Sequence, residues 1–464
     1  MAWIPHTIPR STLHAFSARQ SSDVTDATDG NGIRSDDFGW ARRTPKPLWT
    51  LTVDAMAADF ALFPRALMDA LTPTNAAYLA ETLDTGLPVA TVEHVLVDEY
   101  WRRRLNQLPL RQRPIGAPVT AVAEPARTVC LNELASRAVE DLESGRTAEG
   151  WPDELLVFGR HVTALRVGQL RTSEPADRND STFGDPVRAD VGAVLGGLPE
   201  LRSLSLCFGL PPLGARYHGL TVADLDAFGR GLTALPRLTA LAVTGSRVDA
   251  TRFETLSPHL ALCDRLEEVD LSHCWLKCAG AASVACYAAT ARSLRSVTLR
   301  DNGVAADGVQ SLAFMSVARR RNGYPAIELN LGMNNITDIG ARYLASALAS
   351  GTQPFTKLRI GTCNISEVGG VNIVESLAYD QGLRALEMNN NPLTLKVGIA
   401  LHAALKTNFN IEYLSTQNCE FPARMAQFFN TIAYYNRNNK RTKLKYLNIE
   451  DLYDEIEEEN VSSE

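Results

Sequence analysis

Apolar residues recur from residue 162 onward in the pattern Lxx(L/V)x(L/V/I)xx(N/C)x(L/V/I), where x is any residue. The clearest copy has its first, fourth, sixth, ninth and eleventh positions at Leu266, Val269, Leu271, Cys274 and Leu276. Further copies begin at residues 294, 326, 355, 383 and 411, and weaker copies begin at 162, 201, 238 and 444. Four of the steps (238 to 266, 266 to 294, 355 to 383 and 383 to 411) are 28 residues long. Self-similarity at a fixed period indicates an array of about ten stacked repeats.

The alternating apolar positions of each copy predict a short strand, and successive strands should stack in register as a parallel sheet. One repeat cannot bury its own apolar face, so the copies must be contiguous. At the ninth position the chain turns inward, and a buried amide can satisfy backbone groups that have left the strand ladder. We interpret the cysteines at this position, Cys274, Cys363 and Cys419, as small partial substitutes for that amide.

The second half of each repeat is predicted to be a helix. Glycine stands six residues after the ninth position at Gly280, Gly308, Gly340 and Gly369, where it lets the helix backbone approach the strand layer. Apolar residues then follow at helical spacing. A strand and a helix in each 28-residue repeat predict an α/β fold, a ribonuclease-inhibitor-like leucine-rich-repeat solenoid with parallel strands inside and helices outside. Its sixth positions should form one buried column: Leu299, Leu331, Ile360, Met388 and Thr416.

The chain before the repeats differs from them in composition and in the spacing of its apolar residues. Residues 1–44 are rich in Ser, Asp, Thr and Gly and are predicted to be a disordered tail. Residues 45–125 carry apolar residues at helix-like intervals and predict a small all-helical module with a linker. We assign residues 126–452 to the solenoid and residues 453–464 to an acidic tail.

Composition excludes several classes of function. The net charge of −7 does not indicate a nucleic-acid-binding protein, and no apolar run is long enough to cross a bilayer. The eight cysteines match neither a metal pattern nor a disulfide framework, and we expect reduced thiols in the cytosol. There is no GxxxxGK[ST] phosphate loop, HExxH or GxSxG motif. We therefore expect no enzyme activity and no cofactor.

Two segments and the irregular early repeats of this chain carry a resemblance to a known family. The first segment runs from Leu51 to Phe60. The second is an acidic pair followed by Tyr-Trp and basic residues, here Asp98-Glu99-Tyr100-Trp101-Arg102-Arg103. The third likeness is the long early repeats that begin at His161-Val162. Over about residues 48–440 the chain therefore resembles the family of the leucine-rich-repeat subunit five of the axonemal nexin–dynein regulatory complex, also called T-complex-associated testis-expressed protein 1, and the tails have no counterpart in it.

This resemblance implies a non-enzymatic scaffold in motile cilia and flagella that links doublet microtubules and regulates motility. The expected location is the axoneme, part of the cytoplasmic cytoskeleton. The implied partners are the other coiled-coil and leucine-rich-repeat subunits of that complex, with no nucleic acid and no membrane. Two alternatives stay open. One is a cytosolic inhibitor or immune adaptor, and the other is a Ran-type GTPase activator, for which Arg300 is the residue we nominate as an arginine finger.

The fifth position of each repeat should point away from the helices, because side chains alternate along a strand. We predict that this column forms a partner-binding face. We also expect the charges of Arg359 and Glu387 to lie side by side and partly neutralise each other. The column comprises Asp270, Thr298, Asn330, Arg359, Glu387, Ser415 and Asn448.

Overall fold

The computed structural model describes residues 46–62, 68, 70–108, 124–140, 157–168, 191–208, 220–421 and 423–438. The predicted tails 1–44 and 453–464 lie outside these residues, as do the copy that begins at residue 444 and its Asn448. The chain divides into two compact units, Met1–Ala55 and Met56–Glu464. The described residues of the first unit include the first part of helix α2 (Leu48–Ala58). Within this unit, Lys46 Nζ lies 2.7 Å from Asp54 Oδ2.

The second unit contains a parallel sheet of nine strands in the order of the sequence, β1 to β9. Each strand pairs with the next one along the chain, as the repeat pattern predicts. We name each repeat by the residue number of its first position. The strands are β1 Ala164–Val167, β2 Ser203–Leu206, β3 Ala240–Val243, β4 Glu268–Asp270, β5 Ser296–Thr298, β6 Ile327–Asn330, β7 Phe355–Arg359, β8 Ala385–Glu387 and β9 Tyr413–Ser415.

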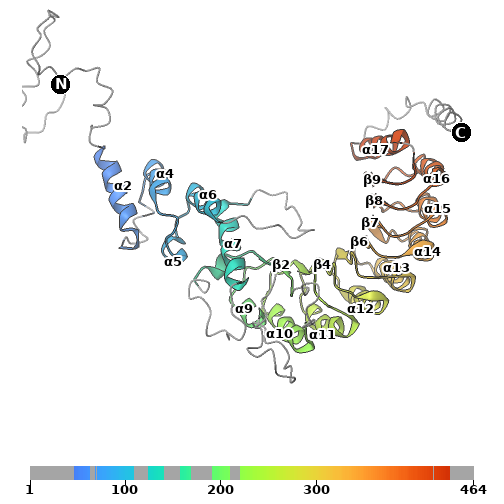
Figure 1. The fold of residues 1–464 in the computed structure, drawn as a ribbon, viewed down its shortest axis with the longest axis horizontal. Coiled ribbons are helices and arrows are strands. Elements are labelled where there is room, and N and C mark those ends of the chain that lie inside the picture. The colour runs from blue at the N-terminus through green and yellow to red at the C-terminus, as the bar shows by residue number, and fades with distance from the viewer. Residues whose placement is uncertain are drawn as a thin grey trace, which may run out of the picture. The chain divides into compact units, whose positions relative to one another are not determined.

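Helices connect the strands and lie on one side of the sheet, along the outer side of the curved repeat stack in Figure 1. Those that follow β1 are α9 Val191–Leu195, α10 Val222–Leu232, α11 Ala250–Leu260, α12 Lys277–Thr290, α13 Ala306–Arg321, α14 Thr337–Leu348, α15 Glu367–Ser376, α16 Leu395–Leu405 and α17 Ala423–Arg437. The opposite side of the sheet carries no helix among the described residues, and we call it the concave face.

The elements described between α2 and β1 are all helical. They are η1 Phe60–Leu62, α4 Pro73–Thr82, α5 Val89–Val92, α6 Asp98–Gln107, α7 Ala126–Glu140 and η3 Gly159–His161. The stretch 126–452 that we assigned to the solenoid therefore begins with a helix, α7, rather than with a strand. None of the described helices has both the length and the apolar character needed to cross a membrane.

The sixth positions form the buried column that the sequence predicts. Leu299, Leu331 and Ile360 are fully buried, and Met388 and Thr416 are 2% and 7% exposed. The backbone explains their alignment, because each sixth-position N–H donates to the fifth-position carbonyl of the next repeat, as from Leu331 to Arg359 at 2.8 Å. Burial of such side chains supplies the dominant stabilisation of the stack.

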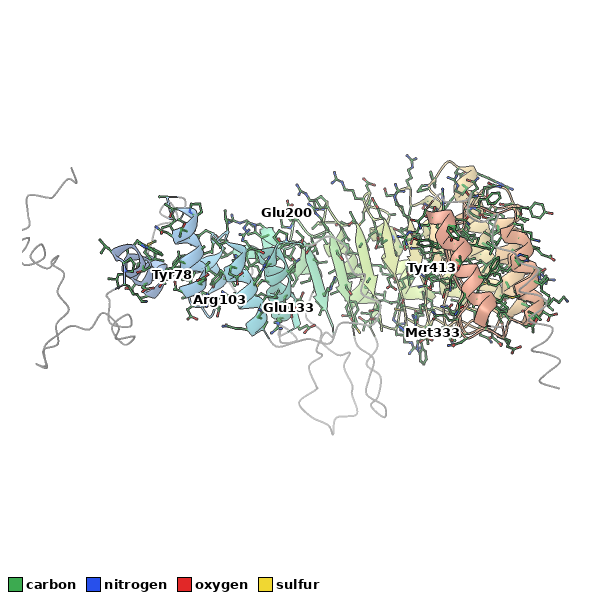
Figure 2. All side chains as sticks on the ribbon, turned by 90° about the horizontal axis from the view of Figure 1, so that it is seen from above. Tyr78, Arg103, Glu133, Glu200, Met333 and Tyr413 are labelled. Carbon is green, nitrogen blue, oxygen red and sulfur yellow. The ribbon has the colours of Figure 1, made fainter. Side chains whose placement is uncertain are left out.

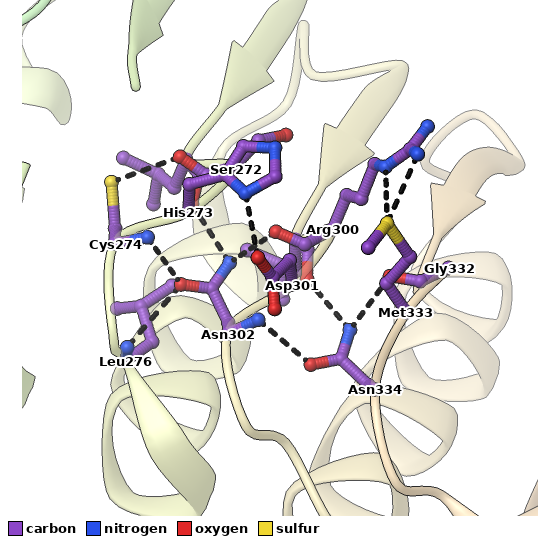
Figure 3. A network of polar contacts seen from close by, with 12 residues as sticks. Ser272, His273, Cys274, Leu276, Arg300, Asp301, Asn302, Gly332, Met333 and Asn334 are labelled. Carbon is purple, nitrogen blue, oxygen red and sulfur yellow. Dashed lines mark hydrogen bonds and ion pairs between the residues drawn. The ribbon is translucent and has the colours of Figure 1, made fainter. Parts of the chain in front are cut away.

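Asparagines at the ninth position join neighbouring repeats through buried hydrogen bonds (Figure 3). Asn334 Oδ1 accepts from the backbone N–H of Asn302 at 2.9 Å and of Val304 at 3.0 Å. Its Nδ2 donates to the carbonyls of Leu299 and Leu331, both at 2.8 Å. One amide thus satisfies four backbone groups beyond the strand ends, which is why the sequence keeps an amide there.

The ninth-position cysteines make fewer of these bonds. Cys274 Sγ donates to the carbonyls of Val243 at 3.0 Å and Ser272 at 3.3 Å. Cys363 Sγ lies 3.3 Å from the carbonyl of Leu331 in the same arrangement. A thiol reproduces the donor half of the amide, so the interpretation of these cysteines as structural substitutes is confirmed.

The conserved spacing of glycine within the helices is explained by close packing. A Cβ at Gly308 would lie 2.7 Å from Val304 Cγ1 and 3.1 Å from Ala281 Cβ. A Cβ at Gly369 would lie 2.5 Å from Asp338 Oδ1. The helix therefore meets the eleventh-position residue of its own repeat and the helix of the preceding repeat at distances that leave no room for a side chain.

Helix α7 packs against β1 and satisfies the outer edge of that strand. Asn132 Oδ1 accepts from the backbone N–H of Thr163 at 2.9 Å and of Ala164 at 3.2 Å, and Ser136 Oγ accepts from Arg166 N at 3.0 Å. These two side chains are four residues apart on α7, so they lie on one face of the helix. An edge strand presents unpaired backbone groups, and α7 covers them.

A second set of buried polar side chains closes the helix ends. Arg319, 1% exposed, donates to the carbonyls of Ala288, Ala291 and Leu294, the last at 2.7 Å. Asn408 occupies the equivalent place in repeat 383 and donates to Leu377 O at 2.8 Å. Repeat periodicity in the sequence did not single out these side chains. They satisfy helix C-terminal carbonyls that have no partner inside the helix.

Candidate protein-binding face

The sheet brings six of the seven predicted face residues into one row. Cα partners run from Asp270 to Thr298, to Asn330, to Arg359, to Glu387 and to Ser415 across five consecutive strand pairs. The first five are partly exposed. Ser415 differs because it is 6% exposed and its hydroxyl donates to Asn389 Oδ1 at 2.6 Å. The use of this row by a partner stays a prediction.

Arg359 and Glu387 form the expected pair, with Nε and Oε1 2.9 Å apart. Their side chains are 33% and 24% exposed, so water still reaches the pair. A partly exposed pair of this kind contributes under about 1 kcal/mol to stability. Its charges remain available to orient a partner, since interface charges affect specificity more than affinity.

Asp270 lies at the start of the row and is partly buried. Its Oδ1 accepts from the backbone N–H of Ser272 at 2.9 Å and from the Ser272 hydroxyl at 2.5 Å. Burial raises the pKa of the Asp270 carboxyl, and the hydrogen bonds from Ser272 oppose that change. The nearby charge of Arg300 also lowers the pKa of Asp270, which shows that this carboxylate responds to a cation at the face.

A second row lies beside the first on the same face, formed by the third positions. It comprises Glu268, Ser296, Glu328, Lys357, Ala385 and Tyr413. Lys357 Nζ lies 3.0 Å from Glu328 Oε2. Burial raises the pKa of Glu268, and the negative charges of Glu328 and Glu267 raise it further. This row doubles the width of the face, although our prediction named only the fifth positions.

A ridge follows the ends of the strands at the eighth positions. Its residues His273, Asp301, Met333, Thr362, Asn390 and Asn418 all have left-handed backbone with φ between 51° and 61°. In Figure 2 Met333 lies at the edge where the strands end and Glu200 at the edge where they begin. Backbone N–H groups of the ridge donate to seventh-position carbonyls of the next repeat, which holds this conformation in place.

The ridge changes chemistry along its length. His273 Nδ1 lies 2.7 Å from Asp301 Oδ2, so an imidazole–carboxylate contact joins repeats 266 and 294. Asn418 Nδ2 donates to Asn390 Oδ1 at 2.8 Å in the last repeats. The contact with Asp301 gives His273 a structural role between two repeats.

Arg300, the nominated arginine finger, is exposed beside this ridge. Its Nε and Nη2 lie 3.2 Å and 3.0 Å from the sulfur of Met333 (Figure 3). A thioether is a weak acceptor, so this contact holds the guanidinium loosely. The same arrangement suits a surface arginine at a protein interface.

The two buried ninth-position thiols, Cys274 and Cys363, are arranged for packing rather than for reaction. Burial raises the pKa of Cys363 to about 12 and raises that of Cys274 as well. A thiol in this state carries little thiolate, the form that attacks substrates or binds metals. Across the described residues, no group of three or more His, Cys, Asp or Glu side chains could hold a metal ion.

Comparison with known proteins agrees with this geometry at the level of the repeat. A family model described as "Leucine Rich repeat" matches residues 290–313 and 327–345. Both segments span a strand of the sheet, β5 and β6, and the start of the helix that follows it. The chain is a leucine-rich-repeat solenoid. The predicted fold class is therefore confirmed.

The solved structures that match the chain share little sequence with it and have low TM-scores. The crystal structure of a TLR13–ssRNA13 complex has 14% identity and a TM-score of 0.30, covering 57% of this chain and 37% of that one. The tropomodulin C-terminal domain from Caenorhabditis elegans has 14% identity and a TM-score of 0.24, covering 49% of this chain and 99% of that one. The chain thus spans well under two thirds of the first of these structures. No curated protein matches the sequence.

Proposed function

We propose that this protein is a non-enzymatic scaffold subunit of the nexin–dynein regulatory complex, which links axonemal doublet microtubules and regulates ciliary and flagellar motility. The coarser part of this function, a leucine-rich-repeat scaffold for protein interaction, agrees with the fold and with the polar, helix-free face of its sheet. The axonemal part rests on the resemblance of the helical module and early repeats. Its partners in this proposal are the coiled-coil and leucine-rich-repeat subunits of the same complex.

The observation that best supports the proposal is the position of the Asp98–Arg103 segment, one of the motifs that carry the resemblance. Tyr100 and Trp101 are fully buried, and Trp101 Nε1 donates to Val95 O at 2.7 Å. Asp98 Oδ1 accepts from the backbone N–H of Ala126 at 2.6 Å, at the start of α7. Helix α7 in turn covers β1. The motif therefore joins the helical module to the repeat stack.

A joined module and solenoid suits a linker better than a freestanding inhibitor. Arg103 Nη1 donates to the carbonyl of Ala80 and holds α6 against α4. Arg160 Nη2 lies 3.2 Å from the buried carboxylate of Glu93, which ties the η3 turn to the module. A linker must transmit force between its attachment points, and contacts that run from one element to the next allow this.

Retention with the axoneme tests the proposal. The tagged full-length chain should remain with detergent-extracted axonemes of a motile ciliated cell. A null line should assemble its doublets and show an altered beating waveform, because a linker couples sliding without powering it. Residence in the soluble cytosol together with a normal waveform would overturn the axonemal assignment. The purified protein should leave the rate of GTP hydrolysis by small GTPases unchanged.

A further inference from the structure

The concave face carries most of its unbalanced charge on three adjacent strands, β4, β5 and β6. Across β4 to β6 the third positions are Glu268, Ser296 and Glu328, and the fifth positions are Asp270, Thr298 and Asn330. Hydroxyl side chains on β5 are short, while the side chains on both neighbouring strands are longer. The face therefore has a polar strip of Ser296 and Thr298 along β5 with carboxylates on its two sides, and we call this strip and its flanking carboxylates the β5 channel.

The dimensions of the β5 channel follow from strand spacing. Neighbouring strands lie about 4.8 Å apart, so the backbones of Glu268 and Glu328 are separated by about 10 Å. A guanidinium or ammonium group placed over Ser296 would lie between the two carboxylates and within reach of both. The hydroxyls of Ser296 and Thr298 on the floor can accept further hydrogen bonds from it.

Carboxylates outnumber cations around the β5 channel, because Glu268, Asp270 and Glu328 are accompanied by Lys357 on β7 and by Arg300 just after β5. Burial and the negative charges of Glu328 and Glu267 raise the pKa of Glu268, and burial raises the pKa of Asp270, while the charges of Lys357 and Arg300 act in the opposite direction. The raised pKa values mean that the ionised carboxylates are held at a cost in free energy. Among the described contacts, Lys357 pairs with Glu328, and no cation lies within ion-pair distance of Glu268 or Asp270.

The flanking strands lack this character. Facing positions on β2 and β3 are Ser203, Ser205, Ala240 and Ala242, none of which is charged. On β7 and β8 the charges of Arg359 and Glu387 neutralise each other. A partner that reads the face electrostatically would therefore be positioned on β4 to β6.

We propose that the β5 channel binds an extended basic segment of a partner protein, with an arginine or lysine side chain seated over Ser296 between Glu268 and Glu328. The inference deepens the proposed function, since it rests on the concave face being the surface that meets a partner. Charge complementarity decides the occupant. Excess carboxylate repels phosphate and acidic peptides, and a basic side chain relieves the repulsion among the carboxylates.

Binding of synthetic peptides to the full-length chain tests the proposal. The probe is a fluorescein-labelled twelve-residue peptide of alternating arginine and serine, and the comparison peptide has glutamate in place of arginine. Anisotropy at about 0.15 M salt limits long-range attraction, because the Debye length is then about 8 Å. We expect the arginine peptide to bind and the glutamate peptide not to bind.

Matched variants distinguish the effect of the channel carboxylates on peptide binding from the effect of the net charge of the protein. Glu268→Gln with Glu328→Gln should weaken the arginine peptide about tenfold or more, equivalent to about 1.4 kcal/mol. The control, Glu81→Gln with Glu375→Gln, removes the same charge from exposed carboxylates on the helices α4 and α15 and should change binding less than twofold. Equal weakening in both double variants, or stronger binding of the glutamate peptide, would overturn the proposal.

A third variant occupies the channel from within. Ser296→Arg should place the chain's own guanidinium between Glu268 and Glu328, abolish peptide binding and leave the melting temperature unchanged or higher. Unaltered binding by Ser296→Arg would contradict the proposed seat. Axoneme retention of the wild type tests the proposed function separately. If the double variant Glu268→Gln with Glu328→Gln stays with the axoneme and the full-length chain does not bind the arginine peptide, this inference is wrong while the proposed function stands.

Discussion

The early repeats and the later repeats achieve the same stacking by different means. In repeats 294 and 326 an asparagine at the ninth position satisfies four backbone groups in two repeats. In repeat 238 the ninth position is Ser246, whose hydroxyl accepts from Phe208 N and donates to Thr244 O, both at 2.9 Å. At β1, backbone N–H groups donate instead to side chains of α7, a helix that precedes the repeats.

The spacing of the repeats also differs between the two regions. The step from repeat 162 to 201 is 39 residues and from 201 to 238 is 37, against 28 from 238 to 266 and from 266 to 294. The amide of Asn334 spans the step from 294 to 326, which is 32 residues long, so this amide does not by itself fix the length of the connection.

Removing the later network should have the largest effect on stability. Asn334→Ala leaves the N–H groups of Asn302 and Val304 buried without an acceptor, and we expect a loss of roughly 3 kcal/mol. Urea unfolding followed by circular dichroism measures it. Ser246→Ala is the matched change in an early repeat and should cost roughly 1 kcal/mol. Equal losses at the two positions would contradict the contrast between the regions.

The edge of the early repeats should be the next most sensitive place. Asn132→Ala combined with Ser136→Ala uncovers the N–H groups of Thr163, Ala164 and Arg166, with an expected loss of roughly 2 kcal/mol. Hydrogen exchange should rise at β1 and stay unchanged at β5. Thr82→Ala with Ser346→Ala removes two exposed helix hydroxyls and serves as the control. A uniform rise across all strands would show that α7 stabilises the whole array rather than one edge.

Asp380 offers a smaller effect with a dependence on pH. It is 1% exposed, its Oδ2 accepts from Leu383 N at 2.7 Å, and Oδ1 has no hydrogen-bond partner in the described part of the chain. Burial raises its pKa, so its contribution to stability is full below the unfolded-state value near 4 and declines as pH rises through the folded-state value.

Asp380→Asn removes this decline and should stabilise the protein by roughly 1 kcal/mol at pH 7.5, with a smaller gain at pH 4.5. An amide can still accept from Leu383 N. Parallel urea titrations of the variant and the wild type at the two pH values measure the difference. A gain that is larger at pH 4.5 would contradict the sign of the pKa change. Glu375→Asn, an exposed carboxylate on α15, is the control.

The charges of the concave face should affect stability least. Arg359→Glu places two carboxylates side by side and should lower the melting temperature only slightly, because the pair is partly exposed. It should nevertheless weaken incorporation into the axonemal complex that we propose for this protein. Adding Glu387→Arg restores a pair in reversed order. If the double variant recovers incorporation, the pair itself matters; if it does not, the position of each charge does. A large loss of stability with normal incorporation would make the pair a structural one.

The periodic pattern was sufficient to predict the strands, their register and the buried column. Leu299, Leu331 and Ile360 are identified by spacing alone because a repeat that places them elsewhere exposes its apolar face. The pairing of Arg359 with Glu387 followed from the same register. Asn334 and Cys363 could be assigned a shared role since both occur where the chain leaves the strand.

Contacts between side chains that no pattern relates were decided by the tertiary structure. Asn132 and Ser136 resemble any polar residues of a helix until α7 lies against β1. Glu268 and Glu328 are 60 residues apart and become neighbours of Ser296 only through the stacking of three strands. Local sequence determines which side of an element is apolar, because that depends on the period of one strand or helix. The distance between charges on different repeats depends on how the repeats stack, and only the folded chain sets it.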